Sequence, residues 1–318
     1  MTIKKSTPTR LLLIGFGRMG VTHLSIISGL LYPKPLEVYI VDPSFVSRFL
    51  AKELYTSVNV FRKLTDVRRK YSENFFDICI VSTPPLGRVE IMGDVKYLAR
   101  KVFIEKPLIV KLEDNQMSGY VLQHAPLNKD VFALMAKESI VRVNAVLTTN
   151  ISFANLKNGW RSGKFGSVLY EFGGHLLTLI AATCGDKEFL SKEYSLNSIT
   201  SAAVEADHVE FEISSGNTIF NIELIAGSER VRKASYNIEY ITQDNCYAYD
   251  LYSLTSRSLI ESKDENVILN IADRDSKVNF YVRGFEFTLQ MQAFLDGTMD
   301  TLTQDQLNNI EQIVEGVI

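Results

Sequence analysis

The chain of 318 residues is 46% hydrophobic and 22% charged, an ordinary globular composition at a length that predicts two domains. The net charge of −3 excludes the basic footprint of a nucleic-acid-binding protein, and no apolar run is long enough to predict a membrane span or a signal peptide. Cys79, Cys184 and Cys246 lie far apart without metal-ligand spacing, so we predict reduced thiols, a cytoplasmic protein and no metal site.

The first predicted elements are a short buried strand and a glycine-rich turn. Leu11–Ile14 is apolar without alternation, which predicts a strand buried on both faces, and Val21–Leu30 predicts a helix. The turn between them matches G-x-G-x-x-G. Its first glycine permits the bend, its second lets the backbone approach a pyrophosphate, and its third packs the helix on the strand. The candidate cofactor contacts here are Gly15, Phe16, Gly17, Arg18, Met19 and Gly20.

An acidic residue closes the next predicted strand, Leu36–Val41. Asp42 lies 22 residues after Gly20, where a carboxylate accepts hydrogen bonds from an adenosine ribose. This carboxylate would repel a 2′-phosphate, so we predict NAD rather than NADP, a preference that Arg48 would soften. The alternative interpretation is that Asp42 only begins a turn with the Pro43-Ser44 pair that follows it.

Helices and strands continue to alternate through the first half, which predicts a doubly wound parallel sheet of the Rossmann type. The charges in Arg62–Lys70 predict a solvated helix face. The expected helices are Phe45–Leu54, Asp66–Tyr71, Val89–Ala99 and Glu113–Leu122, and the expected strands are Val58–Phe61, Asp77–Ser82, Lys101–Ile104 and Asp130–Met135.

Polar turns follow two of these strands, and ligands of an open parallel sheet bind at the carboxyl ends of its strands. Ser82-Thr83-Pro84 should therefore border the cofactor, although it also reads as a plain strand-to-helix turn. Glu105-Lys106-Pro107 places charges where they suit a site better than a core. Lys106 is positioned to hydrogen-bond substrate and nicotinamide groups or to relay a proton.

In the second half, Gly166–Leu179 predicts a loop that enters a helix at Gly173-Gly174. His175 lies near the start of this helix, and Glu171, four residues earlier, would face the same way if the helix begins early. A lone histidine among leucines is more often a packing residue, so both interpretations of His175 remain open.

The pattern then changes to period two, which predicts a largely antiparallel sheet. A hairpin is expected at Gly216-Asn217, and frequent tyrosines predict an aromatic, partly exposed sheet face that packs on another subunit. Helices Phe280–Gly297 and Thr303–Val317 close the chain. The expected strands are Ser195–Ala203, Asp207–Ile213, Thr218–Leu224, Tyr236–Thr242, Asn245–Asp250 and Val267–Ile271, and the tyrosines are Tyr236, Tyr240, Tyr247, Tyr249 and Tyr252.

Together these motifs carry a resemblance to one family. The chain resembles the glucose–fructose oxidoreductase / inositol dehydrogenase (Gfo/Idh/MocA) family over nearly its full length. The matching features are His23 three residues after Gly20, the Thr83-Pro84 turn, the E-K-P at Glu105–Pro107, the segment Gly166–Thr178 as a counterpart of G-x-L-x-D-x-G-x-H-x-x-D, and FLDG at Phe294–Gly297.

The resemblance implies a Rossmann NAD-binding domain over residues 1–137 and an α/β domain over residues 138–318 for substrate binding and oligomerisation. It implies NAD(P)-dependent hydride transfer at a sugar, cyclitol or nucleotide-sugar carbon, in a homodimer or homotetramer. Lys106 and His175 would be the catalytic pair, with His175 as the acid/base. The implied substrate contacts are Lys106, Trp160, Arg161, Glu171, His175 and Thr178.

Four departures from the family pattern keep a second function class open. Glu171 and Thr178 replace aspartates, Arg88 replaces a histidine, and Ala136–Ser162 lacks the G-H-N-x-R-F motif. The loss of a carboxylate at Thr178 supports a non-catalytic NAD-binding sensor or scaffold of the same fold. Retention of Lys106 and His175 favours the enzyme.

Overall fold

The computed structural model forms two compact units, which we describe separately. The first comprises Met1–Gly119 and Phe287–Asp300, and the second Tyr120–Glu286 and Thr301–Ile318. The predicted domain division at residues 137 and 138 stays a prediction. The structure describes residues 7–55, 57–108, 111–125, 128–135, 138–156, 166–184, 194–199, 207–227, 234–243, 245–251, 259–262, 279–298 and 302–317.

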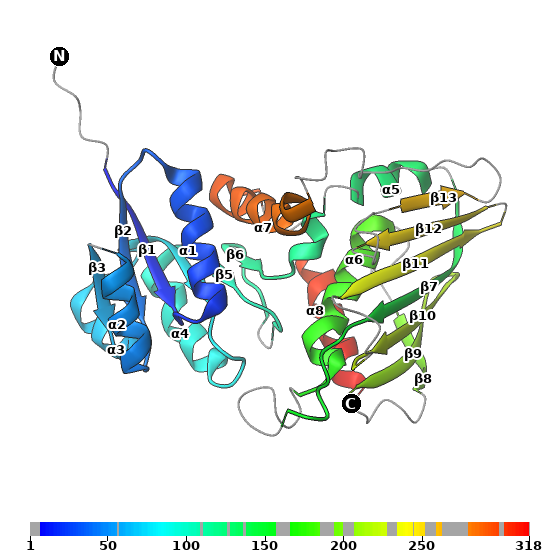
Figure 1. The fold of residues 1–318 in the computed structure, drawn as a ribbon, viewed down its shortest axis with the longest axis horizontal. Coiled ribbons are helices and arrows are strands. Elements are labelled where there is room, and N and C mark those ends of the chain that lie inside the picture. The colour runs from blue at the N-terminus through cyan, green and yellow to red at the C-terminus, as the bar shows by residue number, and fades with distance from the viewer. Residues whose placement is uncertain are drawn as a thin grey trace, which may run out of the picture. The chain divides into compact units, whose positions relative to one another are not determined.

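The first unit contains a parallel sheet in the order β3-β2-β1-β4-β5-β6 (Figure 1), which confirms the predicted Rossmann-type architecture. Its strands are β1 (Thr9–Ile14), β2 (Leu36–Val41), β3 (Val58–Phe61), β4 (Phe76–Val81), β5 (Ala99–Ile104) and β6 (Gln116–Ser118). Its helices are α1 (Arg18–Leu31), α2 (Phe45–Leu54), α3 (Leu64–Lys70), α4 (Arg88–Leu98) and the last part of α7 (Asn279–Asp296).

The β1 strand is buried on both faces, as its unbroken apolar sequence predicts. On one face Leu11 and Leu13 join a core cluster with side chains of α1, α2 and the end of α7. Lys101 Nζ donates a hydrogen bond to the Leu295 carbonyl near the end of α7, 2.9 Å away, and Gly297 follows with φ of +77°. The end of α7, which lies far along the chain, therefore completes the core of the first unit.

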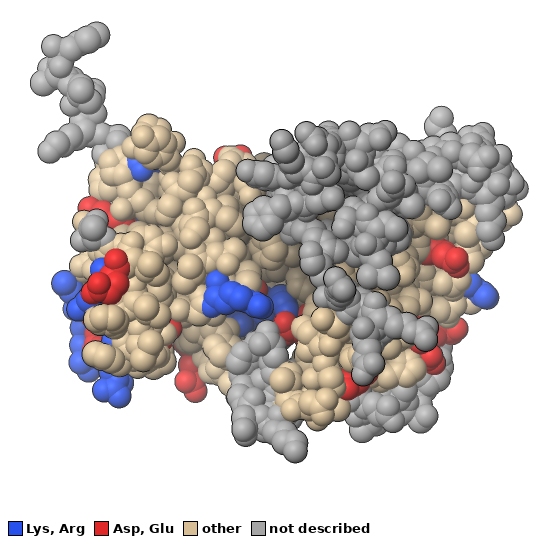
Figure 2. Space-filling view, viewed as in Figure 1, with Lys and Arg blue, Asp and Glu red and all other residues tan. Residues whose placement is uncertain are grey.

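The basic side chains of α3 are solvated, as expected from Arg62–Lys70. Arg68, Arg69 and Lys70 are exposed, and Figure 2 shows blue side chains in the region of the first unit where α2 and α3 lie.

Two of the elements predicted between residues 113 and 135 are wrong. Glu113–Leu122 is not a helix, because it contains β6 and then a 3₁₀ turn at Val121–His124. Met117, Tyr120 and Val121 are all buried at helix-like spacing, which explains the misreading. Asp130–Met135 is not a strand but part of α5 (Asn128–Met135), since a short apolar run does not distinguish a strand from a buried helix.

The second unit contains a seven-stranded sheet in the order β13-β12-β11-β7-β10-β9-β8, antiparallel except where β7 pairs with β10. The expected strand Val267–Ile271 lies outside the described residues. The strands are β7 (Ile140–Thr148), β8 (Tyr194–Ile199), β9 (His208–Ser215), β10 (Thr218–Ile225), β11 (Ser235–Thr242), β12 (Cys246–Leu251) and β13 (Leu259–Ser262). The helices are α5, a π-helical turn at Leu169–Gly173, α6 (Gly174–Cys184), α8 (Gln304–Gly316) and the beginning of α7.

The prediction that the second sheet has a partly exposed aromatic face is wrong. The exposed fractions of Tyr236, Tyr240, Tyr247 and Tyr249 are 4%, 0%, 8% and 1%, while Tyr252 lies outside the described residues. Alternation puts these tyrosines on the inner face of the sheet, and the largely buried helix α6 packs against this unit's core. The outer face instead carries polar side chains, including His208, Glu210 and Glu223.

The hairpin predicted at Gly216-Asn217 is confirmed, because Gly216 has φ of +59° in the two-residue turn between β9 and β10. The α8 helix begins at a capping box formed by the Thr303 and Gln306 side chains. Cys79 and Cys184 are buried thiols outside any disulfide, and Cys246 is a half-buried one. Among the described helices, none is both long and apolar enough to cross a membrane.

Candidate active site

The glycine-rich turn between β1 and α1 has the shape that a dinucleotide requires. Gly15 has φ of +92°, and a Cβ there would lie 2.9 Å from the Ser82 carbonyl oxygen. A Cβ at Gly20 would lie 2.2 Å from the Gly15 carbonyl oxygen. Gly17, by contrast, is exposed with no atom within 4 Å of its would-be Cβ. The turn is therefore tight on its inner side and open where a pyrophosphate would approach.

The other residues of the turn divide between core and surface. Phe16 is 6% exposed and belongs to the core cluster, whereas Arg18 is exposed and Met19 is half-buried. Gly17 caps α1 without a side-chain acceptor, which leaves the first backbone N–H groups of α1 for an anion.

Asp42 occupies the end of β2 and is 8% exposed. Its Oδ2 accepts a hydrogen bond from the Phe16 amide at 2.8 Å, and its Oδ1 accepts one from the Ser44 amide at 2.8 Å. Arg48 donates to the Asp42 carbonyl oxygen rather than to its carboxylate. The carboxylate thus ties the glycine turn to the second strand and keeps further lone pairs for ribose hydroxyls.

The turn after β4 borders the same edge of the sheet. Ser82 Oγ donates to the Gly15 carbonyl at 2.7 Å, which joins the two turns. Thr83 Oγ1 is buried with no hydrogen-bond partner among the described residues, and Pro84 is exposed. A buried hydroxyl that lacks a partner at a strand end is suited to a ligand.

The segment Glu105-Lys106-Pro107 follows β5, and the peptide bond before Pro107 is cis. Glu105 is 6% exposed, and its Oε1 lies 2.5 Å from Nε2 of the fully buried His23. The Lys106 amide donates to Glu105 Oε2 at 3.2 Å, and the Lys106 side chain is half-buried. His23 on α1 thus supports the segment that carries Lys106.

These features of the first unit fit a dinucleotide. Its glycine cradle, open helix N-terminus, Asp42 carboxylate and unpartnered Thr83 hydroxyl are the groups that a pyrophosphate and its riboses need.

In the second unit, His175 is half-buried in the first turn of α6. Tyr120 packs edge-on against it, with ring centroids 5.6 Å apart, and the Tyr120 hydroxyl donates to Glu311 of α8. A Cβ at Gly174 would come within 2.6 Å of the Tyr120 ring. The glycine that was predicted to start the helix therefore also lets Tyr120 lie against His175.

Carboxylates gather near the π-helical turn. Glu171 is half-buried on this turn, where the helix has already begun before His175. Burial raises the pKa of the Tyr236 phenol, and the nearby charges of Glu171 and Glu286 raise it further. Glu286 is 1% exposed, and burial raises its own pKa to about 7. Sequence reasoning missed Glu286, because its burial depends on tertiary packing that no local pattern of the sequence specifies.

The remaining predicted substrate residues are placed as follows. Thr178 is fully buried, and its hydroxyl donates to the His175 carbonyl at 3.0 Å. Trp160 and Arg161 lie outside the described residues.

His124, which was not among the predicted site residues, is also buried. Burial lowers the pKa of His124 to about 4, so this imidazole is neutral at physiological pH.

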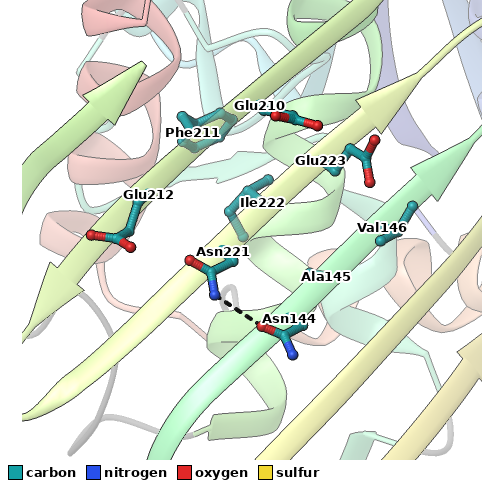
Figure 3. A pocket seen from close by; sticks show the side chains of 9 residues that line it. All are labelled: Asn144, Ala145, Val146, Glu210, Phe211, Glu212, Asn221, Ile222 and Glu223. Atoms are coloured by element: carbon teal, nitrogen blue, oxygen red, sulfur yellow. Dashed lines mark hydrogen bonds between the residues drawn. The ribbon is translucent and has the colours of Figure 1, made fainter. Parts of the chain in front are cut away.

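The outer face of the second sheet has a hollow of about 300 Å³ over β7, β9 and β10 (Figure 3), lined on its polar side by Asn144, Glu210, Glu212, Asn221 and Glu223. Beside it, His208 Nε2 lies 3.1 Å from Glu223 Oε1, and these atoms lie within 4.8 Å of a Glu210 oxygen. The contact between the His208 imidazole and the Glu223 carboxylate is enough to explain why these three side chains lie together. The hollow is on the opposite face of the sheet from the buried tyrosines.

No protein-family model and no curated protein matches this chain, but solved structures match over nearly its whole length. A levoglucosan dehydrogenase in complex with NADH and L-sorbose is 14% identical, with a TM-score of 0.75 over 97% of this chain and 95% of that one. GenD2 from gentamicin A biosynthesis, in complex with NAD, is 16% identical, with a TM-score of 0.66 over 98% and 94%. A mutant of KijD10, a 3-ketoreductase from Actinomadura kijaniata in complex with TDP-benzene and NADP, is 12% identical, with a TM-score of 0.67 over 98% and 96%.

These structures are NAD(P) oxidoreductases of the Gfo/Idh/MocA type. This chain has the Gfo/Idh/MocA fold. The first sheet ends with β6 at Ser118, and the chain leaves it through Gly119–His124.

Proposed function

We propose that the protein is an NAD(H)-dependent oxidoreductase that transfers a hydride to or from a carbinol or carbonyl carbon of a sugar, cyclitol or nucleotide-sugar. The observation that carries the proposal is that the glycine cradle and the Lys106 segment lie at the carboxyl edge of one parallel sheet. Solved structures of the same fold hold NADH, NAD or NADP, and one of them holds L-sorbose. This likeness supports both the cofactor and the substrate class.

The proposed cofactor is NAD, which supplies the hydride-accepting or hydride-donating ring when bound. We assign its contacts to Gly15–Gly20, Asp42, Ser82–Pro84, Glu105 and Lys106. The Asp42 carboxylate favours NAD over NADP, because a 2′-phosphate would bring a second negative charge against it. Calorimetric titration with both dinucleotides tests this preference, and equal or reversed affinities would refute it.

We assign distinct roles to the two predicted catalytic residues. His175 exchanges the hydroxyl proton of the substrate, because an imidazole titrates in the range needed for both directions of reaction. Lys106 hydrogen-bonds the reacting oxygen, with its backbone held by Glu105. Trp160, Arg161, Glu171 and Thr178 remain proposed substrate contacts.

The test is absorbance of the nicotinamide at 340 nm with a panel of sugars and nucleotide-sugars. Replacing His175 with Asn should lower turnover by roughly 10²–10⁴-fold and leave NAD affinity nearly unchanged, since general acid/base assistance is lost while the cofactor cradle is intact. Lys106→Ala should lower turnover and also weaken the binding of NAD. Near-native turnover of the His175→Asn variant would move the acid/base role to Lys106 or to a tyrosine.

One observation favours a second candidate, a non-catalytic NAD-binding sensor or scaffold. Thr178 stands where the family has an aspartate, and its hydroxyl is bound within α6. Tight NADH binding without turnover on the whole panel would favour this candidate.

Assembly and cellular location are further parts of the proposal. We propose a homodimer or homotetramer in the cytoplasm, with residues 1–137 serving the cofactor and 138–318 serving substrate and assembly. The buried tyrosines no longer support this assembly, so its support is the family resemblance. Light scattering that reports a monomer at micromolar concentration would contradict it.

A further inference from the structure

Arg88 is among the largest fully buried side chains of the described residues, with an exposed fraction of 1%. It is the first residue of α4, directly after Gly87, which has φ of +78°. Its Nη1 donates hydrogen bonds to the carbonyl oxygens of Glu105 and Pro107, and its Nη2 donates one to the carbonyl oxygen of Thr83. The guanidinium thus bridges the turn after β4 and the segment after β5.

These contacts suit arginine better than any other side chain. A buried cation needs acceptors for its N–H donors, and here three backbone carbonyls accept from the two terminal nitrogens of one planar group. A lysine ammonium keeps the charge but lacks the rigid fork that spans carbonyls on two segments. Because all three acceptors belong to the backbone, Arg88 fixes the course of the main chain itself.

Further buried contacts hold the same segment. Glu105 accepts from the Lys106 amide and contacts His23, as described above. A Cβ at Gly119 would lie 2.8 Å from Glu105 Cα and from the Lys106 nitrogen, so the backbone after β6 closes the other side. The main chain at Lys106 is enclosed, and the Arg88 bridge is the one of these contacts that also reaches Thr83.

We propose that Arg88 is a positioning residue that joins the Thr83 turn to the Glu105–Pro107 segment and thereby shapes the place that receives the nicotinamide half of the cofactor. This role rests on the proposed function and refines it, since the guanidinium acts through the backbone carbonyls that it bonds. The family's usual histidine at this position has too short a side chain and too few donors to make the same three bonds.

The role predicts a selective loss of binding. ADP-ribose carries the adenosine, pyrophosphate and riboses of NADH but no nicotinamide, so it depends on the Gly15–Gly20 turn and Asp42. In Arg88→Lys, NADH affinity should fall by about tenfold, equivalent to about 1.4 kcal/mol or one hydrogen bond, while ADP-ribose affinity stays within about twofold. Arg88→Met, which also removes the charge, should lose at least as much NADH affinity. Arg68→Lys on exposed α3 is the matched control and should change neither affinity.

Calorimetric titration of NADH and ADP-ribose against the full-length wild type and these variants tests the proposal. A selective loss of NADH affinity in Arg88→Lys supports it. Equal losses of affinity for NADH and ADP-ribose would show that Arg88 has a merely structural role. Unchanged affinities for both ligands would show that Arg88 has no role in binding. Either result overturns the proposal. Should Arg88→Met fail to fold, Arg88→Lys alone decides. A wild type that binds ADP-ribose but not NADH would instead overturn the proposed function, and this role with it.

Discussion

Replacing Glu286 with Gln should change the pH dependence of stability. The Glu286 side chain is 1% exposed, its Oε2 has no hydrogen-bond partner among the described residues, and burial raises its pKa from 4.5 to about 7. Because the folded pKa lies above the unfolded value, the proton is held more tightly in the folded state. The resulting stabilisation is fully present below about pH 4.5 and is lost as the pH rises through about 7.

The size of this effect follows from linkage. A pKa raised from 4.5 to about 7 corresponds to about 3 kcal/mol at 1.36 kcal/mol per pH unit, of which about 2.5 kcal/mol is lost between pH 5 and pH 8.5. The Gln side chain has no proton to lose. The free energy of unfolding of Glu286→Gln, relative to wild type, should therefore rise by about 2.5 kcal/mol over this interval.

Urea unfolding at the two pH values measures the difference. Glu53→Gln, on the exposed surface of α2, is the control and should shift the free energy of unfolding equally at both. A Glu286→Gln difference that does not change with pH, or that falls at the higher pH, would refute the burial argument.

Three further predictions concern packing and capping. Gly20→Ala should destabilise the protein by about 1–3 kcal/mol and weaken NADH binding, because its Cβ would meet the Gly15 carbonyl. Gly29→Ala, with open space on the same helix, should instead stabilise the protein by about 0.5–1 kcal/mol. The melting temperatures of the two variants should therefore shift in opposite directions. Thr303→Ala removes the capping box of α8 and should cost about 1 kcal/mol in urea unfolding, and an unchanged midpoint would count against the cap. His23→Leu should cost about 1.5–3 kcal/mol by the same assay, since it removes the imidazole hydrogen bond to the buried Glu105 carboxylate.

Much of the first unit could be predicted from the sequence because its signals are local. Leu36–Val41 and Phe45–Leu54 were predicted with the observed bounds, since an apolar strand next to a turn and an N-capping Ser44 leave little ambiguity. The β6 strand was missed because it has only three residues and its neighbours are spaced as in a helix. The β7 strand was missed because its partners β10 and β11 come more than 70 residues later.

In the candidate site too, residues in local motifs could be predicted and residues placed by tertiary contacts could not. Asp42 and Lys106 follow strands in recognisable motifs, so their places at the sheet edge could be predicted. Arg88 was noted only as a departure from a motif, because its three acceptors come from two separate turns. The burial of Glu286 depends on tertiary packing that no local pattern specifies. The tyrosines were assigned to the wrong face because period two shows alternation but not which side the helices cover.

The most direct test of hydride transfer is isotopic. The protein would be incubated with NADH carrying deuterium at the transferable position and with a panel of keto-sugars and keto nucleotide-sugars, and the products analysed by mass spectrometry. The account predicts a product alcohol that gains a single deuterium with wild type, and far less of it with His175→Asn. Tight NADH binding with no deuterium in any product would contradict the assignment as an oxidoreductase and leave a dinucleotide-binding protein without turnover.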